Sequence, residues 1–75
     1  MTTQAHRHLA LADRHIAEAE ARVAHQRELI ATQAAAGEDA TVSLELLEVL
    51  ERSLVLTHQH RRTILAEIVG TVAPL

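Results

Sequence analysis

Large aliphatic residues recur at seven-residue intervals in both halves of this chain, and this spacing limits the fold more than any other feature. The first half carries one such row, formed by Leu9, Ile16, Val23 and Ile30. The second half carries two parallel rows, formed by Leu47, Leu54, Arg61 and Ile68 and by Leu50, Thr57 and Ile64. A seven-residue apolar repeat is typical of helices that pack side by side in a shallow supercoil. The chain is therefore expected to be all-α.

The two halves are separated by Gly37, a residue that favours the left-handed conformation found just past a helix C-terminus. We predict one antiparallel two-helix hairpin with coiled-coil-like packing over residues 1–75, with helices at about 3–35 and 41–69 and a turn at 36–40. Thr2 or Thr3 is expected to cap the first helix, and Asp39 or Thr41 the second. Gly70 and Pro74 are expected to mark the exit from the second helix.

The position of the turn also predicts which residues face each other. If the turn centres near residue 38, the numbers of facing residues sum to about 77. Three of the four resulting layers are aliphatic, with Leu9 facing Ile68, Val23 facing Leu54 and Ile30 facing Leu47. This agreement favours a hairpin over one continuous helix.

The second helix is apolar on more sides than one partner helix can cover. Val49 and Leu56 lie nearly opposite Leu47 and Leu54 on a helical wheel. The chain has 75 residues, no cysteine and no aromatic residue, and cores of this size usually need disulfides, a metal or oligomerisation. We therefore expect a homo-oligomer, with a dimer that forms a four-helix bundle favoured, or docking of a helix from another protein. The predicted interface residues are Leu9, Ile16, Val23, Ile30, Leu47, Val49, Leu50, Leu54, Leu56, Ile64 and Ile68.

One layer of the predicted hairpin is polar. Arg61 interrupts an aliphatic row, and Thr57 precedes it by one turn. Asp13 and Glu20 flank Ile16 on the facing helix, where either carboxylate is placed to pair with Arg61. We interpret the aliphatic stem of Arg61 as packed against Ile16 and its guanidinium as paired with these carboxylates. Such a polar group in the seam fixes the register at some cost in stability. The alternative is an anion or a partner's carboxylate bound at this layer.

The six histidines raise the alternative of a small metal- or haem-binding bundle. Two ligands on one helix face need a spacing of three or four residues, whereas His58 and His60 are two apart and diverge. A site would have to combine helices, for example through His15, His58 and His60. We expect no metal and no cofactor. Stoichiometric metal in the purified protein would instead favour the metal-binding alternative.

Other function classes find little support in the composition. The formal net charge of −3 and the absence of aromatics argue against nucleic-acid binding. Apolar runs are far shorter than the roughly 20 residues that span a bilayer, and no signal peptide is expected, so we predict a cytoplasmic protein without membrane attachment. No catalytic motif is present. Glu48 and Arg52 have the spacing of an ordinary ion pair within one helix.

Several segments resemble a group of short alphaproteobacterial proteins of unassigned function, and the similarity extends from about residue 9 to residue 66. The resembling segments are His15-Ile-Ala-Glu-Ala-Glu20, Gln26-Arg-Glu-Leu-Ile30, Gly37-Glu-Asp39, Leu46-Leu47, His60-Arg61 and Ile64-Leu65. The group often has His-Asp-Thr after the glycine, where this chain has Glu38-Asp39-Ala40. The resemblance implies a helical hairpin, and because the group has no known activity, it assigns no functional residues. The prediction is a non-enzymatic, self-associating helical module for protein–protein interaction.

Overall fold

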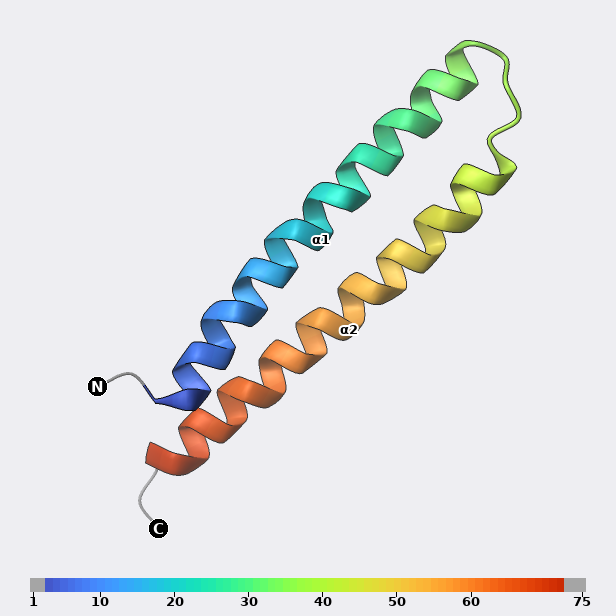
Figure 1. Cartoon of the computed structure of the whole chain (residues 1–75). Coiled ribbons are helices and arrows are strands. Elements are labelled where there is room, and N and C mark those ends of the chain that lie inside the picture. Colours follow the sequence, from blue (N-terminus) through green and yellow to red (C-terminus); the bar gives the residue numbers. More distant parts are fainter. Residues whose placement is uncertain (1–2, 73–75) are drawn as a thin grey trace.

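The computed structural model describes residues 3–72 of the chain, and their side chains as far as residue 70. Two long helices, α1 (Gln4–Ala35) and α2 (Thr41–Val72), lie side by side in antiparallel orientation (Figure 1). They pack against each other to form a rod with extents of 60 × 21 × 12 Å. The described residues contain no β-strand. The prediction of an all-α hairpin is confirmed.

The first helix begins and ends with hydrogen bonds that its sequence predicts. The Thr3 hydroxyl accepts a bond of 3.1 Å from the His6 N–H, so Thr3 is the N-cap. Thr2 lies outside the described residues. At the other end Gly37 has a φ of 72°, and its N–H donates to the Ala34 carbonyl at 3.1 Å. The next N–H, from Glu38, donates to the Gln33 carbonyl at 2.9 Å, which completes a Schellman motif.

The second helix begins at Thr41, and Asp39 binds this residue from the preceding loop. The Asp39 carboxylate accepts hydrogen bonds from the Thr41 hydroxyl at 2.6 Å and from the Thr41 N–H at 3.0 Å. These two bonds, the hydroxyl's above all, lower the pKa of Asp39 below its ordinary value of 3.8.

The far end of α2 differs from the prediction, because the helix runs through Gly70 and ends at Val72. A glycine weakens a helix by about 1 kcal/mol relative to alanine but keeps its N–H, so it does not by itself stop one. Pro74 lies outside the described residues.

The core is a single seam between the two helices. Its buried apolar side chains are Ala12, Ile16 and Val23 from α1 and Ile64 from α2. The other predicted seam residues are half-buried, namely Leu9, Ile30, Leu47, Leu50, Leu54 and Ile68. Alanine alternates with the large residues along the buried face of α1, which lets the helices approach closely. Because one seam buries one side of each helix, most of both helices stays exposed.

Candidate interaction surface

Among the described residues, two ion pairs and one histidine–carboxylate contact connect the helices and fix their register. The Arg27 guanidinium lies 3.2 Å from the Glu51 carboxylate, and the His58 imidazole lies 4.0 Å from the Glu20 carboxylate. The third pair joins Arg61 to Asp13. The residue numbers sum to 78, 78 and 74 in these pairs, close to the predicted value of about 77.

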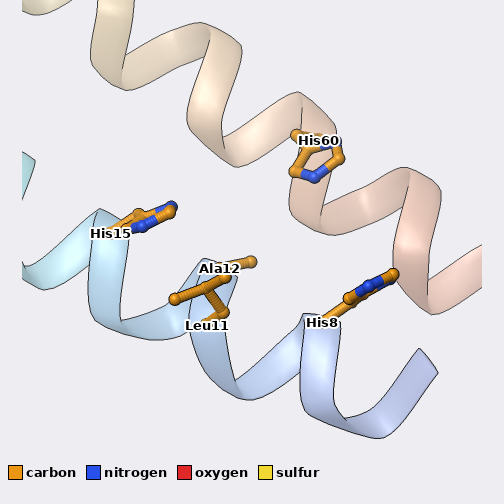
Figure 2. A pocket seen from close by; sticks show the side chains of 5 residues that line it. All are labelled: His8, Leu11, Ala12, His15 and His60. Carbon is orange, nitrogen blue, oxygen red and sulfur yellow. The ribbon is translucent and has the colours of Figure 1, made fainter. Parts of the chain in front are cut away.

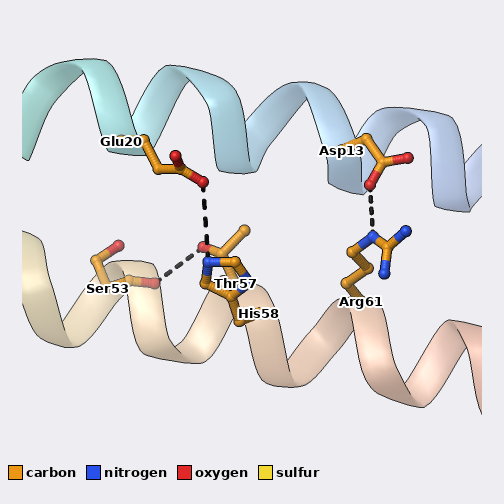
Figure 3. A network of polar contacts seen from close by, with 6 residues as sticks. All are labelled: Asp13, Glu20, Ser53, Thr57, His58 and Arg61. Atoms are coloured by element: carbon orange, nitrogen blue, oxygen red, sulfur yellow. Dashed lines mark hydrogen bonds and ion pairs between the residues drawn. The ribbon is translucent and has the colours of Figure 1, made fainter.

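The polar residues predicted to form one layer divide into separate contacts (Figure 3). Arg61 donates from Nε to Asp13, one of the two carboxylates considered as its partner. Glu20 does not reach Arg61 but lies against His58, one turn nearer the connecting loop. The Thr57 hydroxyl donates to the Ser53 carbonyl of its own helix at 2.9 Å, so this hydrogen bond does not cross the seam. The predicted four-residue layer is therefore corrected to two cross-helix pairs.

These pairs position the helices more than they stabilise them. The side chains of Arg61 and Asp13 are 35% and 54% exposed, and ion pairs at such positions contribute about 0–1 kcal/mol. Their effect is on register, because a slide of one helix along the other would break all three pairs together.

A buried polar contact that the apolar rows do not predict also joins the two helices. Gln26 is buried in the seam, and its Nε2 donates to the Ser43 carbonyl at 2.9 Å. Gln33 lies seven residues further along α1, and its side-chain oxygen is buried without a hydrogen-bond partner. Both glutamines continue the alanine row of Ala12 and Ala19, and following that row would have found them.

Two of the three histidines considered as metal ligands share a pocket, and the third lies elsewhere. His15 and His60 line a shallow pocket together with His8, Leu11 and Ala12 (Figure 2). His58 instead pairs with Glu20 (Figure 3), so it does not join His15 and His60. Among the described residues, no group of three or more histidine, aspartate or glutamate side chains is placed to hold a metal ion.

A second apolar row lies outside the seam on α2. It comprises Val42, Leu46, Val49 and Leu56, all exposed, and we call it the outer stripe. The spacings of four, three and seven residues are those of a coiled-coil face. At 3.6 residues per turn the outer stripe is rotated by roughly 100° from the seam. Val49 and Leu56 therefore do not face α1, and the predicted interface divides into the seam and the outer stripe.

The other flank of α2 is less continuous. Leu44, Val55 and Val69 are exposed there, but Glu48 and Glu51 separate the first two. Only Ser53 interrupts the heptad pattern of the outer stripe between residues 42 and 56. The outer stripe is thus the more complete apolar face for a helix to cover.

The exposed area of the hairpin is large for its mass. The 8.2 kDa chain exposes 5840 Å², whereas a compact monomer of this mass exposes about 4,500 Å². The difference, about 1,300 Å², exceeds the roughly 800 Å² that each partner buries in a standard protein–protein interface.

No family model, curated protein or solved structure matches this chain, so the surface is interpreted from its geometry. Within residues 3–72, neither helix has a stretch long and apolar enough to cross a membrane.

Proposed function

We propose that this hairpin is a non-enzymatic, self-associating helical module, in which a second copy covers the outer stripe and completes a four-helix bundle. The observation that carries the proposal is the outer stripe itself, which has the spacing of a helix–helix contact and is exposed. In a four-helix bundle each helix packs against two neighbours about a quarter turn apart, and the seam and the outer stripe of α2 have that relation.

Area and charge support a second copy as the occupant. The exposed surface exceeds that of a compact monomer by enough for a standard interface. A formal net charge of −3 leaves only weak repulsion between two copies. A helix of another protein would use the same stripe, and the experiment below distinguishes it from a second copy.

A matched pair of variants tests the proposal. Val49 on the outer stripe and Val55 on the other flank are 54% and 53% exposed, so neither substitution disturbs the seam. Val49→Lys should weaken association because it buries a charge in the new interface, whereas Val55→Lys should leave it unchanged.

The measurement is the solution mass of the full chain by light scattering over a concentration series, with helicity followed by circular dichroism. We expect a wild-type dimer and an at least tenfold higher dissociation constant for Val49→Lys. A folded wild-type monomer at all concentrations would overturn self-association and favour a heterologous helical partner. Equal losses in both variants would reject the outer stripe as the contact.

A further inference from the structure

We propose that two copies pair through α2 in antiparallel orientation, with Val49 beside the twofold axis and Glu45 facing the partner's Arg52. This inference rests on the proposed self-association and adds the geometry of the interface.

The outer stripe has a defined centre. It extends from Val42 to Leu56, and Val49 lies midway between them. In a twofold dimer the same patch meets itself, so an antiparallel pair that buries the whole stripe must place Val49 next to the axis. Val42 of one copy then lies level with the partner's Leu56, and Leu46 packs between the partner's Val49 and the partner's Leu56.

Two opposite charges flank the stripe on the same side. Glu45 precedes Leu46 and Arg52 precedes Ser53, seven residues apart, so both lie along one edge of the stripe. With Val49 at the axis, Glu45 of each copy is level with the partner's Arg52. The dimer would thus contain two symmetry-related ion pairs at the edge of its interface.

The seam shows the same arrangement within one chain. Arg27 pairs with Glu51 there, and each residue directly follows a seam residue, so the pair lies at the edge of the antiparallel contact. Glu45 and Arg52 directly precede residues of the outer stripe pattern, which places them at an equivalent edge.

These charges also select one register and one orientation. A slide of one heptad in one direction would bring Glu45 against the partner's Glu45, and a slide in the other direction would bring Arg52 against the partner's Arg52. In a parallel pair, Glu45 and Arg52 lie a full heptad apart along the axis and cannot meet. Antiparallel pairing centred on Val49 is the arrangement that joins opposite charges.

Both charged groups are available in the isolated hairpin. Neither Glu45 nor Arg52 forms an ion pair within residues 3–70. The bond between Arg52 and Glu48 that their spacing predicts is not formed. Pairing across the dimer would therefore not have to break an existing contact.

Charge exchange tests this geometry. Glu45→Arg and Arg52→Glu should each raise the dimer dissociation constant about tenfold, because each replaces two attractions with two repulsions. The double variant Glu45→Arg/Arg52→Glu should recover wild-type affinity. An equimolar mixture of the two single variants should form a heterodimer, since every facing pair is then of opposite sign. Recovery in the double variant and the mixture also shows that the single variants fold.

Cysteine cross-linking tests orientation independently, because the chain has no cysteine of its own. Val42→Cys and Leu56→Cys should form a mixed disulfide when combined under oxidation, and intact mass distinguishes it from either homodimer. Val55→Cys, on the other flank, serves as the control and should cross-link weakly.

The outcomes separate this inference from the proposed function. A monomeric wild type overturns both. The wild type could form a dimer whose affinity does not change in the charge-exchange variants, or Val42→Cys and Leu56→Cys could each cross-link only to themselves. Either result would leave self-association standing and would reject antiparallel pairing through Val49.

Discussion

Replacement of Arg61 by leucine should stabilise the hairpin, although it removes the ion pair between Arg61 and Asp13. Arg61 occupies a row otherwise formed by Leu47, Leu54 and Ile68. Its guanidinium reaches Asp13 at the edge of the seam, where water competes for both groups. The effect of the substitution is therefore a balance between a weak ion pair and apolar burial.

The magnitude follows from exposure. With side chains 35% and 54% exposed, the Arg61–Asp13 pair contributes at most about 1 kcal/mol. A fully buried leucine contributes about 1.5–3 kcal/mol, and a half-buried seam position gains roughly half of that. Because Asp13 stays in water after the substitution, its lost partner costs little. The net expectation is a gain of about 0.5 kcal/mol, which raises the Tm by about 2–4 °C in a domain of this size.

Thermal and urea denaturation followed by circular dichroism would measure this change, at two protein concentrations so that association is separated from folding. Asp13→Asn is the matched control, because it weakens the ion pair and keeps the arginine stem in the seam. We expect its stability to stay within about 0.5 kcal/mol of wild type. A loss of more than about 1 kcal/mol in both variants would show that the ion pair supports the hairpin and would refute this argument.

Two further substitutions test the core and the second cap. Val23→Ala should lower the free energy of unfolding by about 1–3 kcal/mol, because Val23 is buried in the seam. Val55→Ala, at an exposed site, should change the free energy of unfolding little. Equal effects of the two substitutions in urea denaturation would contradict a core at the seam. Asp39→Asn tests the lowered pKa of Asp39: its folded pKa lies below the unfolded one, so its stabilising effect is present above about pH 4 and is lost as the pH falls through the folded pKa. As the pH falls through the folded pKa of Asp39, the Asp39→Asn variant should lose less stability than the wild type. If both proteins lose stability equally in acid, the bonds from Thr41 do not cause the pH dependence.

The hairpin could be predicted because independent signals agree. The seven-residue rows on each half must be buried, Gly37 supplies the conformation that ends α1, and Asp39 with Thr41 starts α2. The divergence of His58 and His60 could also be predicted, since a two-residue spacing turns side chains to different sides of a helix. His60 accordingly lies in the pocket with His15, and His58 pairs with Glu20.

The polar contacts could not be predicted in the same way. Asp13 and Glu20 both flank Ile16, and the sequence does not show which of them meets Arg61 and which meets His58. That choice depends on the rotation of each helix about its axis. Gln26 is a similar case, because its buried amide needs an acceptor that only the packing of the two helices brings within reach. The Ser43 carbonyl becomes that acceptor once the hairpin closes.

The contrast between the helices explains why the proposed association falls on α2. Among its described residues, α1 exposes two large aliphatic side chains, Leu11 and Leu29. Its remaining outer positions are mostly small, charged or histidine. Most of the large apolar residues of α2 lie in the seam or in the outer stripe, about 100° apart. An isolated hairpin needs only the seam to fold, so the outer stripe is not required for folding. An exposed apolar face of this kind promotes aggregation unless another helix covers it. Contact between two copies of α2 would bury the surface that the hairpin leaves exposed.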